Sequence, residues 1–174
     1  GLEIGDEVII SESNFSITDF EYDVWSVFGA NENPSLNLVI YKNDGIPVNE
    51  NQSKPNTIIY KSEPINLEKG YQKINLKNMN LNIKNNFTWS IKFNGLKNTI
   101  DSRAGLVLGD SATVGQSYKN YWEKINGEWL LSGETSSSAE NNYSAKIWAY
   151  KNSGTILSYT PDIGFIGNDS FEYS

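Results

Sequence analysis

The 174-residue chain contains no cysteine and no histidine. Their absence excludes Ser-His-Asp and Cys-His nucleophilic catalysis, histidine general-base chemistry and zinc sites of the ordinary type. The chemistry that remains belongs to carboxylates, hydroxyls, lysines and aromatic rings. An exported protein without disulfides is more typical of a bacterial surface than of an animal one, although the same absence is compatible with a cytosolic protein.

Positive charge is also scarce. Arg103 is the only arginine, and 14 Lys and Arg residues stand against 21 Asp and Glu residues, for a net charge of -7. Nucleic-acid binding needs a basic surface that is rich in guanidinium groups, so the composition disfavours a nucleic-acid partner. No apolar run approaches the roughly 18 residues of a membrane span, and we therefore expect no membrane insertion.

Aromatic residues, by contrast, are abundant. They make up 13% of the chain and include 5 Trp and 10 Tyr. A globular chain of this length can form one domain with a sizeable core, but not two ordinary domains with linkers. We expect one domain at residues 1–152 and a separate C-terminal β segment at residues 153–174.

Apolar and polar residues alternate along most of the chain. In "NFTWSIKF" every second residue from Phe87 to Phe93 is apolar, which predicts a strand with one buried and one solvated face. The same pattern predicts strands in "LNLVIYK", "TIIYKS", "YQKINLK", "RAGLVLG" and "NYSAKIWAY". Many short strands separated by Gly, Pro and Asn clusters predict an all-β fold. We expect an antiparallel two-sheet sandwich that is jelly-roll-like, with a barrel as the alternative. The longest connection, residues 43–56, is expected to run over the surface.

The clearest turn lies in "YWEKINGEWLL". Asn126 and Gly127 tolerate the positive φ angles that both central positions of a type I′ turn require, so they predict a two-residue hairpin. In that register Lys124 faces Trp129, and Trp122 lies on the same hairpin face as Trp129.

Three acidic residues alternate with apolar ones in "TDFEYDVW". Asp19, Glu21 and Asp23 share one strand face, at roughly 6 to 7 Å between neighbours. They would repel one another unless they are solvated or bridged by a cation, and Ca²⁺ is the cation that carboxylate oxygens in such domains bind most often. The two interpretations are a structural calcium site and a solvated acidic face.

Six aromatic residues are candidates for ligand binding, because the apolar face of a sugar ring stacks on an aromatic ring. Four of them cluster in sequence around the hairpin and fit equally the role of core residues: Trp122, Trp129, Tyr118 and Tyr121. Trp148 differs, since the alternation places it on the polar face of its strand. Trp25 is in phase with the acidic residues, and we expect it to be exposed near any bound cation.

Seven segments, taken in order, resemble a known family. These are "IGDEVIISESNFSITDFEYDVW", "LNLVIYKNDGIP", "TIIYKSEPINL", "FTWSIKFNG", "AGLVLGDSATVGQSYKNYWE", "GEWLL" and "NYSAKIWA". Together they are similar to the large exported domain of PEP-CTERM-type sorting proteins and related bacterial surface proteins, over about residues 4–149. The segment "LGDSAT" departs from the family pattern, which has an aromatic residue before the Asp and prolines after it. The resemblance implies an exported β-sandwich whose biochemical activity is largely unassigned.

The C-terminal segment "GTILSYTPDIGFIGNDSFEYS", about residues 154–174, resembles the closing strands of bacterial cadherin-like or immunoglobulin-like repeats. About twenty residues are too few to fold alone. The segment is either a final hairpin that docks on the sandwich or a stub of an adjoining repeat. Both alternatives imply a module of a longer surface protein, with neighbouring domains of the same chain as partners.

These features favour a non-catalytic extracellular module of a bacterial surface or secreted protein, serving adhesion, spacing or matrix organisation. Its partner would be a polysaccharide or a surface protein. The alternative is a carbohydrate-binding module attached to a secreted enzyme, which predicts exposed Trp or Tyr on a flat face beside Asn, Asp and Gln. A pure spacer predicts that every Trp is buried. We expect no enzymatic activity, because the carboxylates nearest the hairpin turn, Glu123 and Glu128, lie where an acid stays solvated.

Overall fold

The computed structural model describes residues 2–10, 14–109, 118, 120–133 and 143–151. These residues form twelve β-strands and no helix, arranged as two antiparallel sheets. The predicted all-β, two-sheet fold is confirmed, whereas the jelly-roll connectivity stays a prediction. The expected segment at 153–174 lies outside the described residues. Among the residues that are described, no helix has the length and apolar character that crossing a membrane requires.

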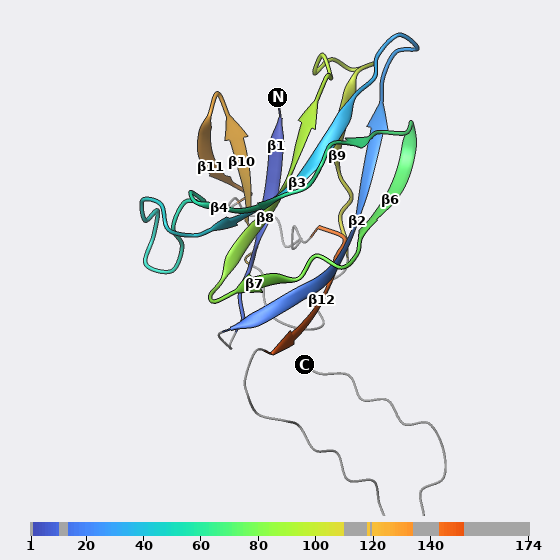
Figure 1. The fold of residues 1–174 in the computed structure, drawn as a ribbon. Coiled ribbons are helices and arrows are strands. Elements are labelled where there is room, and N and C mark those ends of the chain that lie inside the picture. The colour runs from blue at the N-terminus through green and yellow to red at the C-terminus, as the bar shows by residue number, and fades with distance from the viewer. Residues whose placement is uncertain (1, 11–13, 110–117, 119, 134–142, 152–174) are drawn as a thin grey trace, which may run out of the picture.

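The first sheet has seven strands, and at its centre the N-terminal strand β1 lies beside β8, from the middle of the chain (Figure 1). In spatial order the strands are β11 (Glu128–Ser132), β10 (Tyr121–Ile125), β1 (Glu3–Val8), β8 (Phe87–Asn94), β3 (Ser35–Lys42) and β4 (Ile58–Lys61), with β5 (Ile65–Asn66) also paired to β3.

The second sheet has five strands and is organised around one long strand. The order is β12 (Ala145–Lys151), β2 (Phe15–Val27) and β6 (Gly70–Leu76), while β7 (Leu81–Ile83) and β9 (Arg103–Leu106) also pair with β2. Each segment in which alternation predicts a strand overlaps one of the observed strands.

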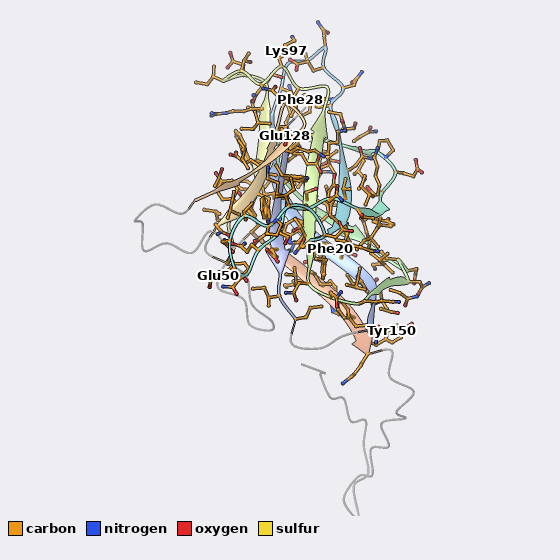
Figure 2. All side chains as sticks on the ribbon, turned by 90° about the vertical axis from the view of Figure 1, so that its left-hand side faces the viewer. Phe20, Phe28, Glu50, Lys97, Glu128 and Tyr150 are labelled. Atoms are coloured by element: carbon orange, nitrogen blue, oxygen red, sulfur yellow. The ribbon has the colours of Figure 1, made fainter. Side chains whose placement is uncertain are left out.

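The main core lies between the two sheets. β8 contributes the apolar residues Phe87 to Phe93, and β2 contributes Phe20, Tyr22 and Val24, all of them buried. Phe20 in the second sheet contacts Trp89 in the first, with ring centroids 5.4 Å apart, and Figure 2 shows Phe20 in the interior. Full burial of each large apolar side chain stabilises the fold by about 1.5–3 kcal/mol.

The opposite side of the first sheet is also covered, which the alternation in β8 does not predict. Thr88 and Ser90, expected to be solvated, are fully buried. They lie beneath a second cluster, which we call the outer cluster, composed of Val39, Tyr41, Trp122, Trp129 and Leu131. The prediction of a solvated face for β8 is therefore wrong. The alternation within a strand shows which residues share a face, but it does not show whether distant segments pack on that face.

The connection between β3 and β4 contributes to this cover. Its residues fold back on one another, with Gly45 N donating to Lys54 O and Lys54 N donating to Ile46 O. Gln52 in this connection is buried, and it reaches the side chains of Glu7 and Asn120. The connection therefore packs on the first sheet instead of merely passing over the surface.

The predicted β10–β11 hairpin is confirmed. Lys124 pairs with Trp129, and Asn126 and Gly127 have φ angles of 53° and 88°. Trp122 and Trp129 meet on one hairpin face, with ring centroids 6.5 Å apart and ring planes at 80°.

Candidate functional site

The outer face of the second sheet gathers most of the candidate residues. Because Phe20, Tyr22 and Val24 of β2 point into the core, the residues that alternate with them point outward. The strand register places the outward neighbours of β6, β9 and β12 on the same side. We call this surface the β2 face; its members are Ser16, Asp19, Glu21, Asp23, Trp25, Val27, Tyr71, Lys73, Asn75, Arg103, Lys146, Trp148 and Tyr150.

A β-bulge between β2 and β12 sets the direction of the side chains at one end of this face. Trp148 pairs with Asp19, but the next residue, Ala149, pairs with Ile17, so Thr18 is the extra residue. The Thr18 hydroxyl donates a 3.3 Å hydrogen bond to the Trp148 carbonyl oxygen. The bulge lets Ile17 and Phe20, three positions apart, both point inward, and it leaves Asp19 and Trp148 side by side on the outside.

The acidic residues of β2 share a lysine from the neighbouring strand. Lys73 Nζ lies 2.9 Å from Glu21 Oε1 and 3.7 Å from Asp23 Oδ1. The hydrogen bond to Glu21 and the charge of both carboxylates raise the pKa of Lys73. Asn75 also donates to Glu21, at 3.4 Å, and the Ser144 hydroxyl donates to Asp23 Oδ2, at 2.6 Å.

One interpretation of the sequence places a Ca²⁺ ion beside these carboxylates. In the structure the ammonium group of Lys73 supplies positive charge at Glu21 and Asp23. Within the described ranges, no group of three or more Asp and Glu side chains comes together as a metal site. Asp19, Glu21 and Asp23 do share one face, as predicted, but they are spread along it.

Trp25 and Tyr71 form one aromatic end of the β2 face. They occupy directly opposed positions on β2 and β6, and Tyr71 is 78% exposed. The Arg103 guanidinium lies 5.9 Å from the centroid of the half-buried Trp25 ring. Gly105, on β9 like Arg103, pairs with Trp25 on the side away from Tyr71, and a Cβ there would have no atom within 4 Å. The surface beside Trp25 is therefore open.

Trp148 and Tyr150 form the other aromatic end. Their side chains are 45% and 53% exposed. Trp148 lies across from Asp19, and Tyr150 lies across from Ser16. Figure 2 shows Tyr150 at the end of the molecule opposite Phe28, the residue that follows β2.

The four hairpin aromatics do not belong to the β2 face. Trp122 and Trp129 are buried in the outer cluster of the first sheet, which fits the interpretation that they are packing residues. Lys124 covers the Trp129 ring, with Nζ 5.1 Å from its centroid. Tyr121 is half-buried against Tyr143, with ring centroids 5.8 Å apart. Tyr118, also half-buried, donates a 3.3 Å hydrogen bond to Asn51 O.

Sequence reasoning missed a buried polar network beneath the outer cluster. Glu3 Oε1 accepts hydrogen bonds from Tyr41, at 2.6 Å, and from Ser90, at 2.7 Å. Tyr41 and Ser90 are buried together with Glu3. Glu3, Gly5 and Glu7 share one face of β1 by alternation, a pattern that is typical of a solvated face. The local sequence does not distinguish a solvated face from one that distant segments cover.

Glu7, four residues further along β1, is also buried. It accepts hydrogen bonds from Asn43 Nδ2, at 2.7 Å, and from Gln52 Nε2, at 3.1 Å. Burial raises the pKa of Glu7, and the bonds from Gln52 and Asn43 lower it in part. Glu3 and Glu7 are about 13 Å apart along the strand, beyond the spacing of about 5–9.5 Å that paired glycosidase carboxylates use.

Comparisons with known proteins return no match, whether to a family model, to a curated protein or to a solved structure. The fold defines the chain as an all-β domain of two antiparallel sheets. The resemblance to exported domains of the PEP-CTERM type and the resemblance of the C-terminal segment to cadherin-like repeats stay predictions.

Proposed function

We propose that this chain is a non-catalytic, jelly-roll-like module of an exported bacterial surface or secreted protein, and that its β2 face attaches to polysaccharide. Adhesion or matrix organisation is the role that such attachment serves. A carbohydrate-binding module of a secreted enzyme is the alternative. The two roles share the same binding face and differ in the parent protein.

One observation carries the proposal: the exposed indole of Trp148 beside the carboxylate of Asp19. A tryptophan in a strand stabilises a domain most when it is buried, so a domain that serves only as a spacer gains nothing from exposing one. The carboxylate of Asp19 makes no hydrogen bond or ion pair with the described residues, which leaves its oxygens free to accept bonds from hydroxyls. An aromatic ring next to a free acceptor suits a sugar, which presents an apolar ring face and polar edges.

The carboxylates of the described chain support a non-catalytic role. Glu21 and Asp23 are both paired with Lys73. Glu7, whose pKa is raised, has both oxygens occupied by Asn43 and Gln52. A general acid needs a raised pKa together with access to substrate, and the buried Glu7 lacks that access.

The experiment is a binding panel of insoluble and soluble polysaccharides, read by pull-down and by Trp fluorescence. We expect saturable binding that Trp148→Ala weakens about tenfold or more. Leu130→Ala is the matched control, because Leu130 is 47% exposed in a strand of the first sheet, away from the β2 face. The control should bind as the unmodified protein does.

Two results would overturn the proposal. One is the absence of binding across the whole panel. The other is binding that Trp148→Ala leaves unchanged, or that Leu130→Ala weakens equally. The absence of binding would favour a surface protein as the partner, whereas binding that does not depend on Trp148 would mean a sugar site elsewhere than the β2 face.

A further inference from the structure

We infer that the β2 face holds a polysaccharide as an extended, uncharged chain that runs along β2 and contacts two separate aromatic subsites. The first subsite is Trp148, and the second is Trp25 with Tyr71. The inference rests on the proposed function, and it adds the shape and the charge class of the ligand.

The spacing of the two subsites is set by a single strand. Trp148 pairs with Asp19, and Tyr71 pairs with Trp25, so six residues of β2 separate them. At about 3.3 Å per residue the two subsites are about 20 Å apart. The bulge at Thr18 lies outside this interval, and the pairing of β2 with β6 is continuous from Phe20 to Ser26. One sugar ring cannot reach both subsites, but an extended chain of several rings can.

Polar side chains line the surface between the two aromatic ends. They are Glu21, Asp23, Lys73, Asn75 and Lys146. The contacts of Lys73, Asn75 and Ser144 hold Glu21 and Asp23 in place. Carboxylate oxygens and amide groups fixed in this way offer acceptors and donors to a row of hydroxyls, at little further cost in conformational entropy.

The charges of the β2 face indicate the class of polymer. Three carboxylates, Asp19, Glu21 and Asp23, are balanced by three cationic side chains, Lys73, Lys146 and Arg103, although the chain as a whole carries -7. A polyanion is attracted by a net positive surface and a polycation by a net negative one. A face with no net charge complements a neutral chain of hydroxyl-bearing rings.

The second subsite has room for a ring. Arg103 of β9 approaches the Trp25 ring, and at Gly105, the β9 residue that pairs with Trp25, a Cβ would meet no atom within 4 Å. Tyr71 projects beside Trp25 and is the most exposed of the large hydrophobic side chains in the described chain. The two aromatic side chains therefore present a platform at the end of β2 opposite Trp148.

The test uses length series of neutral cello-, xylo- and manno-oligosaccharides, with oligogalacturonate and chitosan oligomers as charged probes, measured by calorimetry. We expect the affinity for a neutral series to rise with length until the oligomer spans the two subsites, and then to level off. Trp148→Ala and Tyr71→Ala should each lower the affinity for the longest oligomer about tenfold. The double variant should lose the dependence on length.

Tyr71→Ala removes a side chain that contributes little to packing, so circular dichroism should show an intact fold. Leu130→Ala is the control and should keep the full length dependence. Affinity that does not change with length, an effect of Trp148→Ala without an effect of Tyr71→Ala, or tighter binding of a charged series would overturn the inference. In each of those cases binding that depends on Trp148 would persist, whereas the proposed function fails if nothing binds or if Trp148→Ala leaves binding unchanged.

Discussion

Tyr41 donates a 2.6 Å hydrogen bond to Glu3, and both side chains are buried beneath the outer cluster of the first sheet. Tyr22, buried in the main core, has no hydrogen-bond partner for its hydroxyl among the described residues. These two buried tyrosines thus differ in whether the hydroxyl has a hydrogen-bond partner.

This difference predicts opposite effects of the same substitution. Tyr41→Phe keeps the ring in contact with Trp129 but removes one of the two bonds to Glu3, so the free energy of unfolding should fall by about 1.5–3 kcal/mol. Tyr22→Phe removes an unsatisfied buried hydroxyl and should leave stability unchanged or raise it by about 1 kcal/mol. Urea denaturation of both variants measures the contrast, and equal losses would show that hydroxyl pairing does not decide the outcome.

Burial of Glu7 predicts a specific pH dependence. Its pKa is raised above the ordinary value of 4.5 in the folded protein, so folding favours the protonated form. The favourable contribution of Glu7 is therefore fully present below pH 4.5 and is lost as the pH rises through the folded pKa. We expect the stability of the unmodified protein, measured relative to Glu7→Gln, to decrease between acidic and neutral pH.

The measurement is urea denaturation of both proteins at a series of pH values. Subtracting the free energy of unfolding of Glu7→Gln from that of the unmodified protein cancels the contribution of the other titrating groups. A value of this difference that stays constant, or that increases as the pH rises, would contradict the proposed effect of burial on Glu7.

Sequence alternation predicts which way side chains point, but not what covers them. It correctly places Phe20, Tyr22 and Val24 inward and Trp148 outward, because direction follows from the strand itself. It does not predict that Ser90 is buried and donates a hydrogen bond to Glu3, 87 residues away.

The β2 face shows the same limit. The ion pair between Lys73 and Glu21 joins positions that are 52 residues apart in the sequence. The bulge at Thr18 is not marked by a glycine or a proline in the sequence around it. The contacts that decide the character of this site are set by strand order and register, which a single sequence does not specify.

Two glycines in strands predict contrasting responses to alanine. At Gly5, in β1 between two neighbouring strands, a Cβ would lie 2.3 Å from Trp89 O and 2.7 Å from Ser90 Cβ. β8 is a central strand that is paired on both sides, so its backbone cannot shift without disturbing the pairing. Gly5→Ala should therefore destabilise the protein by about 1–3 kcal/mol. Gly105→Ala meets open space and should stabilise it by about 0.4–1 kcal/mol, because the unfolded chain loses entropy. Thermal unfolding of the two variants compares them, and similar melting temperatures would contradict the close approach at Gly5.

The place of Lys73 between Glu21 and Asp23 predicts how the protein responds to calcium. If the lysine supplies the counter-charge, the melting temperature of the unmodified protein should be the same with Ca²⁺ and with a chelator. Lys73→Ala leaves Glu21 and Asp23 without their shared cation, on the same face as Asp19, so it should lower the melting temperature by about 1–4 °C, and added Ca²⁺ should restore part of the loss. Lys77→Ala is the control, because Lys77 is exposed and follows the last residue of β6. It should neither lower the melting temperature nor make the melting temperature depend on Ca²⁺. A melting temperature of the unmodified protein that rises with Ca²⁺ would instead favour a calcium site at Asp19, Glu21 and Asp23.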